Sequence, residues 1–305
     1  MGRLIKILED KVAYPITCEI DPSNKCPLEC SFCMYKDFLE KDKVDLDWGT
    51  YCGLLDSLMA ENCKSITFTG GGEPLMHPMI NDMVSAAANM NFQVGLITNG
   101  VRLNVLEHPE VFKFIRISID AGTNEVYQKV KGRDFFSRVV KNIKDLMCVI
   151  NPKQTTVGLS FVVTKDNFQD VQTAIKLCDE LGCSYIQFKP DVNDSTYYNK
   201  IGSVNGKNIK TDRHHADTDL PCKIAGLIGV VSANGKVYYC CQKRGDKEYC
   251  IGDLNGGCFS DIWNTRFNIN PKFTECPPCR YMNYAKGLES FIEGANLFYK
   301  HRNFI

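Results

Sequence analysis

The chain has 305 residues, and its 36 Lys and Arg residues balance 36 Asp and Glu residues, so the formal net charge is zero. This balance argues against broad binding to nucleic acid or to a membrane surface, which usually requires a basic excess. Residues 1–20 lack the apolar h-region of a signal peptide, and no apolar run approaches the roughly 18 residues of a membrane span. The 16 cysteines are therefore expected to be reduced, metal-binding thiols of a cytoplasmic protein.

Short β-branched runs alternate with helical patterns along the first part of the chain. We expect strands at 16–20, 65–69, 93–97, 114–119, 156–163 and 185–189, and helices at 46–62, 79–90, 135–150 and 168–181. Such alternation predicts a parallel sheet. Six units are too few for the closed eightfold barrel, so the expected fold is α/β, with a partial (β/α)6 TIM-like barrel over residues 1–190.

The chain beyond residue 190 has a different composition. Residues 191–221 are polar and indicate a linker or a loop that covers substrate. Residues 222–286 are expected to form a small second domain, because Asn234 and Gly235 between two apolar runs indicate a hairpin. A short helix is expected at 259–267, and residues 287–305 are expected to contain a C-terminal amphipathic helix.

Cys26, Cys30 and Cys33 lie on the loop that follows the first expected strand. Three closely spaced thiolates can hold three irons of a [4Fe–4S] cube and leave the fourth iron open to a small molecule. Zinc is the alternative, but a structural zinc site needs four protein ligands, and no fourth ligand lies nearby in sequence.

This spacing, with Phe32 before the last cysteine, resembles the signature of the radical S-adenosylmethionine (SAM) superfamily. The run from Gly70 to Pro74 resembles the family's GGE(P) loop, which contacts the methionine amino group of SAM. The segments around Asn99 and after Ser118 look like those that reach the methionine carboxylate and the ribose, although a glycine run or polar strand ends can also be simple turns. The resemblance implies these SAM-binding residues: Phe32, Tyr35, Gly71, Gly72, Glu73, Asn99, Ser118 and Asp120.

The resemblance also implies a reaction type. An external one-electron reductant such as flavodoxin or ferredoxin would supply an electron, and SAM would be split into methionine and a 5′-deoxyadenosyl radical. That radical takes a hydrogen atom from an unactivated C–H bond, and the protein orients the reactants and excludes water. The chain is therefore expected to be an enzyme, an oxidoreductase or an epimerase.

A second set of cysteines lies in the C-terminal block, at Cys222, Cys240, Cys276 and Cys279. Four thiolates close a [4Fe–4S] cube completely, and zinc on the same ligands is the alternative. The block resembles the single-cluster twitch version of the SPASM extension, and in particular deoxy-scyllo-inosamine dehydrogenase and aminoglycoside epimerases. The resemblance implies SAM and two [4Fe–4S] clusters as cofactors.

Two outcomes suit one auxiliary cluster, namely dehydrogenation, which needs a base, and epimerisation, which needs a thiol hydrogen donor. For every candidate, the alternative is that the residue only packs against its neighbours or is solvated, with no catalytic role. The candidate donors are Cys241, Cys250 and Cys258, and the candidate bases are Lys189, His214 and His215. Gln242 is a substrate contact by resemblance only.

The substrate is expected to be a small polar molecule such as a sugar or an aminocyclitol. Only 25 residues precede Cys26, too few for the leader-binding domain that peptide-modifying members commonly carry there. One alternative is a maturase that epimerises or crosslinks a ribosomal peptide. Another is a non-catalytic iron–sulfur electron carrier. No nucleic-acid or membrane partner is expected.

Overall fold

The computed structural model describes residues 13–36, 43–201, 209–211, 222–268, 287–288 and 290. Within these residues the strands form one ten-stranded sheet in the order β10-β9-β8-β1-β2-β3-β4-β5-β6-β7. The strands are β1 (Thr17–Ile20), β2 (Ser65–Phe68), β3 (Gln93–Thr98), β4 (Phe112–Ser118), β5 (Thr156–Val163), β6 (Tyr185–Pro190), β7 (Ile209–Thr211), β8 (Ile228–Val231), β9 (Lys236–Tyr238) and β10 (Cys250–Asp253).

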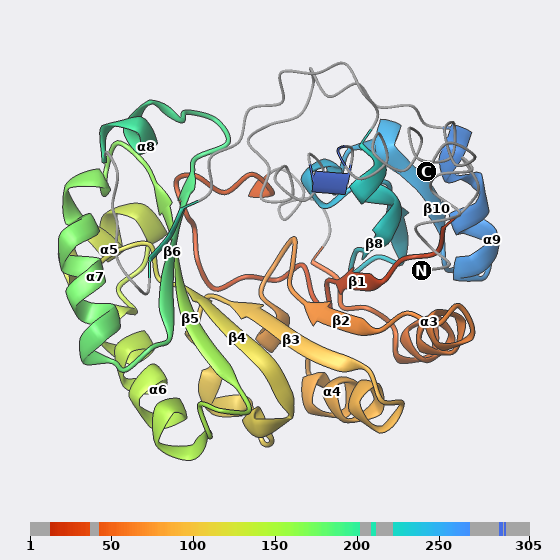
Figure 1. The fold of residues 1–305 in the computed structure, drawn as a ribbon, viewed down its shortest axis with the longest axis horizontal. Helices are drawn as coiled ribbons and strands as arrows, with labels where there is room; N and C mark the ends of the chain where they lie inside the picture. Colours follow the sequence, from red (N-terminus) through yellow and green to blue (C-terminus); the bar gives the residue numbers. More distant parts are fainter. Residues whose placement is uncertain are drawn as a thin grey trace, which may run out of the picture.

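Strands β1 to β6 are parallel neighbours in chain order. Figure 1 shows that this sheet curves, with α4, α6 and α7 on its outer side. All carboxyl ends of parallel strands meet at one edge, where chemistry gathers in barrels of this kind. The expected α/β class with a partial TIM-like barrel is confirmed.

The helices pack apolar stripes against this sheet, which is why their sequences repeat with helical spacing. In α6, for example, Val139, Ile143 and Leu146 recur at helical spacing and are buried. The helices are α3 (Trp48–Ala60), α4 (Ile80–Asn89), α5 (Asn124–Lys131), α6 (Phe136–Val149), α7 (Val171–Glu180), α8 (Thr196–Lys200) and α9 (Phe259–Asn264). The 3-10 turns used below are η6 (Cys241–Lys243) and η1 (Pro74–Met76).

Two helices were not expected from the sequence. Helix α5 begins after Thr123, whose hydroxyl oxygen accepts a hydrogen bond from Val126 N, and it ends at Gly132 in the left-handed conformation. Its inward face is only partly apolar, because the buried residues include Lys131 beside Tyr127. Helix α8 lies inside the segment expected to be a polar linker.

The hairpin expected in the C-terminal block is present and continues the barrel sheet. Gly235 has a φ of 79°, which favours glycine in the tight turn between β8 and β9. Strand β8 pairs in parallel with β1, and Thr17 is opposite Ile228. The domain boundary at residue 222 therefore stays a prediction, and most of the expected C-terminal helix lies outside the described residues.

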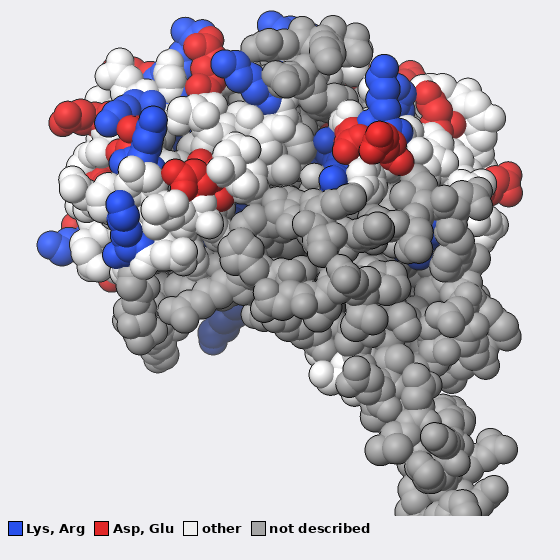
Figure 2. Space-filling model, turned by 90° about the horizontal axis from the view of Figure 1, so that it is seen from above, with Lys and Arg blue, Asp and Glu red and all other residues white. Residues whose placement is uncertain are grey.

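Among the described helices, none combines the length and apolar character of a membrane span. On the face drawn in Figure 2, the described Lys and Arg side chains are interspersed with Asp and Glu.

Candidate active site

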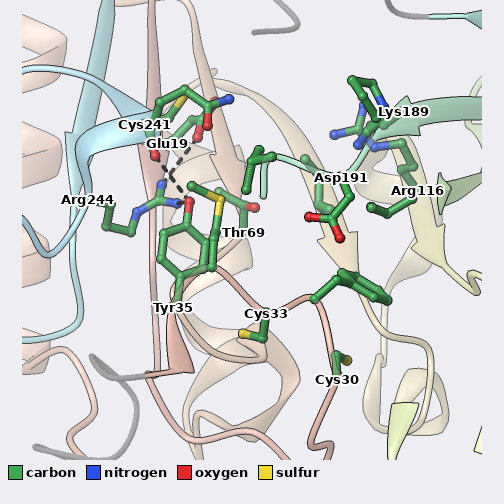
Figure 3. A pocket seen from close by; sticks show the side chains of 18 residues that line it. Glu19, Cys30, Cys33, Tyr35, Thr69, Arg116, Lys189, Asp191, Cys241 and Arg244 are labelled. Atoms are coloured by element: carbon green, nitrogen blue, oxygen red, sulfur yellow. Dashed lines mark hydrogen bonds and ion pairs between the residues drawn. The ribbon is translucent and has the colours of Figure 1, made fainter. Parts of the chain in front are cut away.

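A cavity of about 280 Å³ lies against the cysteine loop, the inner side of the barrel and the C-terminal block (Figure 3). Its walls come from segments that are far apart in the sequence. It is lined by Glu19, Cys30, Phe32, Cys33, Met34, Tyr35, Thr69, Gly70, Ile97, Arg116, Val162, Lys189, Pro190, Asp191, Val192, Cys241, Gln242 and Arg244.

The cysteine loop is held against α5 by backbone hydrogen bonds. Ser31 N donates to the carbonyl of Val130 at 3.0 Å, and Glu29 N donates to the carbonyl of Lys131 at 3.0 Å. These bonds fix the stretch that carries Cys30, and Cys33 N donates back to the Cys30 carbonyl at 3.2 Å. Two bonds to α5 and one bond within the loop therefore define the shape of the loop.

The three loop thiols lie in a poorly solvated place. Burial raises the pKa of Cys26 to about 12 and raises the pKa values of Cys30 and Cys33, with further increases at Cys26 from both neighbouring cysteines. Thiolates here need nearby positive charge, which iron ions supply, so the donor set fits an iron–sulfur cube. In the described part of the chain, no group of three or more His, Cys, Asp and Glu side chains is already arranged around a metal position.

A buried cation stands beside this loop. Lys131 is 2% exposed and pairs with the carboxylate of Asp120, which is fully buried. The same ammonium group lies 5.4 Å from the centre of the Phe32 ring, and its charge partly offsets the raised pKa values of Cys30 and Cys33. Lys131 thus places a positive charge where a negatively charged cube would be bound.

The glycine loop after β2 is shaped by close backbone approach. A Cβ on Gly72 would lie 2.5 Å from the carbonyl carbon of Asn24, so only glycine fits. The buried carboxylate of Glu73 accepts hydrogen bonds from Thr98 Oγ1 at 2.6 Å and Asn99 N at 2.7 Å. Glu73 therefore joins the glycine loop to the end of β3, and burial raises its pKa.

The residues assigned to SAM by resemblance fall into two groups. Phe32 and Tyr35 line the cavity. The others follow or end strands β2, β3 and β4 beside it but are not among its lining residues, and their contacts with SAM stay predictions: Gly71, Gly72, Glu73, Asn99, Ser118 and Asp120.

The candidate catalytic residues also fall into two groups, those that line the cavity and those that do not. Lys189, Cys241 and Gln242 line the cavity. Cys250 and Cys258 do not; the exposed Cys258 thiol donates to Asp261 Oδ2 at 3.1 Å.

Of the expected auxiliary-cluster ligands, Cys222 and Cys240 lie within the described residues. Cys222 and Cys240 pack against the same buried residues, namely Ala225, Tyr239 and Tyr249. Four further predicted residues lie outside the described part of the chain: Cys276, Cys279, His214 and His215.

Two features of the cavity were missed by sequence reasoning. Arg244 is buried and contacts the acidic side chains of Glu19 and Asp21 at the end of β1. Arg116 on β4 lines the opposite wall with Lys189 (Figure 3). The alternation of Glu19 and Asp21 around an apolar Ile20 was the available signal, because buried carboxylates require a cationic partner.

The radical SAM superfamily model matches residues 20–178, so this chain belongs to the radical SAM superfamily. It is a radical SAM enzyme, and SAM and one [4Fe–4S] cluster are its cofactors. The second cluster stays a prediction.

Several curated proteins are similar over most of the chain. The Pyrococcus furiosus tungsten-containing aldehyde ferredoxin oxidoreductase cofactor-modifying protein is 22% identical, covering 84% of this chain and 86% of that protein. PqqA peptide cyclase of Gluconobacter oxydans is 23% identical over 85% and 78% of the two chains. Mycofactocin maturase MftC of Mycobacterium ulcerans is 27% identical over 86% and 78%.

Solved structures share the fold. Streptococcus suis SuiB bound to its precursor peptide SuiA has a TM-score of 0.68 at 15% identity, covering 86% of this chain and 68% of SuiB. Native anSMEcpe with bound AdoMet and Cp18Cys peptide has a TM-score of 0.65 at 16% identity, covering 90% of this chain and 88% of anSMEcpe.

These comparisons correct one expectation. A small-molecule substrate was expected from the short segment before Cys26, but that prediction is wrong. Similar proteins include a peptide cyclase, and similar folds were solved with a precursor peptide and with another peptide bound. The finer resemblance to sugar-modifying enzymes is not shown.

Proposed function

We propose that this protein is a radical SAM maturase that abstracts a hydrogen atom from a peptide and thereby epimerises or crosslinks it. The observation that carries this proposal is the shared cavity. Cys30 and Cys33 of the cysteine loop and Cys241 and Gln242 of the C-terminal block line the same space. A peptide residue in that space would contact both segments at once.

The roles of the chain's own residues follow from this arrangement. Cys26, Cys30 and Cys33 would hold the cube, which together with SAM supplies a 5′-deoxyadenosyl radical when both are bound. Lys131 would offset the negative charge at the cube, and the glycine loop would approach SAM closely because it lacks side chains. Cys222 and Cys240, with Cys276 and Cys279, are proposed to hold an auxiliary cube.

For epimerisation, Cys241 is the donor that the cavity favours, because Cys250 and Cys258 do not line it. The cavity would hold the peptide so that a C–H hydrogen atom is lost to the 5′-deoxyadenosyl radical. The Cys241 thiol would then return a hydrogen atom to the peptide carbon radical. To become a thiol again, the resulting thiyl radical would need one electron from a flavodoxin- or ferredoxin-type reductant and one proton from solvent.

For crosslinking, the carbon radical would instead bond to a second residue, and the product would lose one proton to a base and one electron to the proposed auxiliary cube. Lys189 is the candidate base within the described cavity wall. The two outcomes differ in mass, because epimerisation conserves the hydrogen count and crosslinking removes two hydrogens. In heavy water, epimerisation through an exchangeable thiol would add one deuterium.

The test is anaerobic incubation of the reconstituted enzyme with SAM, dithionite and synthetic peptides encoded by short reading frames beside its gene. We expect deoxyadenosine together with a deuterium-labelled or dehydrogenated peptide. Cys30→Ala should abolish both, whereas Cys241→Ala should retain deoxyadenosine and lose inverted product. Cys258→Ala is the matched control and should behave as wild type. Deoxyadenosine formation with no change in any peptide would contradict the maturase proposal.

A further inference from the structure

A buried polar network connects the C-terminal block to the cysteine loop. Arg244 Nη1 donates to the hydroxyl oxygen of Tyr35 at 3.0 Å, and the same hydroxyl donates to the carbonyl oxygen of Cys241 at 3.1 Å. Arg244 also contacts Glu19 Oε2 at 3.2 Å and Asp21 Oδ2 at 2.9 Å. Figure 3 shows Glu19, Tyr35 and Arg244 converging on one side of the cavity.

Burying this charged network costs free energy of folding, so its presence calls for a functional explanation. Two carboxylates share one guanidinium, and Glu19, Asp21 and Arg244 are at most 4% exposed at their side chains. Burying such groups is unfavourable unless each keeps its partners, and an apolar replacement can be more stable. Stability of the fold alone therefore gives little reason to place an arginine here.

The position of Tyr35 suggests what the network does. Tyr35 lies two residues after Cys33, and its hydroxyl links the cysteine loop to the Cys241–Lys243 turn and to Arg244. The Asp21 carboxylate extends the same network to the glycine loop, because it accepts a hydrogen bond from Gly71 N at 2.9 Å. Three segments beside the expected cofactors thus meet at one guanidinium.

We propose that Arg244 is a positioning residue that, through the Tyr35 hydroxyl, fixes the cysteine loop and the Cys241–Lys243 turn relative to each other. Arg244 acts through its neighbours, so its removal would shift the loop that holds the cube and the turn that faces substrate. The inference rests on the proposed function only for the roles of those two segments, and its test requires no peptide.

The first experiment uses Tyr35→Phe, which removes one hydroxyl and leaves the contacts of Arg244 with Glu19 and Asp21 in place. Tyr51→Phe is the matched control, because the buried Tyr51 hydroxyl donates to the Met83 carbonyl at 2.7 Å on the α3–α4 side. Hydrogen exchange of the full chain without cofactors should show faster exchange at residues 241–244 in Tyr35→Phe and wild-type exchange there in Tyr51→Phe. Unchanged exchange in Tyr35→Phe would overturn the link.

The second experiment measures the loaded enzyme after anaerobic reconstitution. Tyr35→Phe should keep the wild-type iron content but bind SAM about tenfold more weakly, the order expected for one lost hydrogen bond. The electron paramagnetic resonance spectrum of its reduced cluster with SAM should differ from that of wild type. Arg244→Lys, which keeps the charge but not the planar fork, should show the same changes.

The outcomes separate the two proposals. Wild-type SAM affinity and an unchanged spectrum in both variants would overturn the positioning role even if peptide modification were demonstrated. Altered spectra and faster exchange, with no peptide modified by any enzyme form, would support the positioning role and count against the maturase proposal alone.

Discussion

Lys131 and Phe32 meet where the end of α5 reaches the cysteine loop, with the Lys131 ammonium group 5.4 Å from the Phe32 ring centre. Phe32 lies between two of the proposed cube ligands, Cys30 and Cys33. The Lys131 charge is held in place by the buried carboxylate of Asp120. The contact therefore joins a buried ion pair to the loop on which the radical chemistry depends.

Removing this cation should destabilise the protein. Lys131→Met would leave the Asp120 carboxylate buried without its ammonium partner, at a cost of about 3–5 kcal/mol in the free energy of unfolding. Adding Asp120→Asn to this variant should recover part of the loss, because the unpaired charge disappears. Urea unfolding of the cofactor-free chain measures both effects. A loss below about 1 kcal/mol in the single variant, in the range of an exposed ion pair, would contradict this account.

The glycine loop should not tolerate a methyl group at its closest approach. In Gly72→Ala the added Cβ would meet the backbone of Asn24, so one segment must move, at a cost of about 1–3 kcal/mol. Gly53→Ala is the control, since a Cβ there meets nothing and alanine favours helix α3 by about 0.5–1 kcal/mol. Thermal unfolding of both variants is the measurement. Equal melting temperatures would show that the loop is more adaptable than its contacts indicate.

The loop cysteines should determine iron content. Cys30→Ala should lose about four irons per chain after anaerobic reconstitution, the content of one cube. Cys52→Ala, a partly buried cysteine on α3, should keep the wild-type content. Iron and zinc are measured together by plasma emission. Equal iron in both variants, or zinc in place of iron in the wild type, would contradict the cube assignment.

Stability should depend on pH through Asp21. Burial raises the pKa of Asp21 to about 7, although Arg244 and the Gly71 N–H lower it. The folded state therefore binds this proton more tightly than the unfolded chain does. The resulting stability is complete below about pH 4 and is lost as the pH rises through about 7.

Asp21→Asn should remove this contribution. Between about pH 5 and about pH 8, the unfolding free energy of wild type should fall relative to that of Asp21→Asn. Asp145→Asn, at an exposed carboxylate on α6, should keep the wild-type dependence. Parallel curves for wild type and Asp21→Asn over this range would show that Asp21 is already ionised.

The sequence alone predicted those helices and strands in which buried apolar residues follow a regular pattern. Strand β5 has the expected bounds, Thr156–Val163, because a β-branched run is buried on both faces of a parallel sheet. Helix α5 was missed because its buried face includes Lys131. A lysine is expected at the surface, and only its pairing with the buried Asp120 explains why it lies inside. Its capping residue Thr123 was the local signal that could have indicated it.

The sequence predicted those parts of the candidate site whose residues lie close together along the chain. The spacing of Cys26, Cys30 and Cys33 was readable because their ligand role depends on a short stretch of chain. The Arg244 network was not, because Arg244 and Glu19 are 225 residues apart in sequence. Only the fold brings such residues together, and the pairing of β1 with β8 is what does so here.

That pairing limits how the barrel can be divided. Strand β1 lies between β2 and β8, so a chain ending at residue 190 would expose one full side of its first strand. The same cut would remove the guanidinium that contacts both Glu19 and Asp21. A shortened version intended to retain the radical chemistry must therefore carry the β8–β9 hairpin and Arg244 with it, since an open strand edge invites self-association.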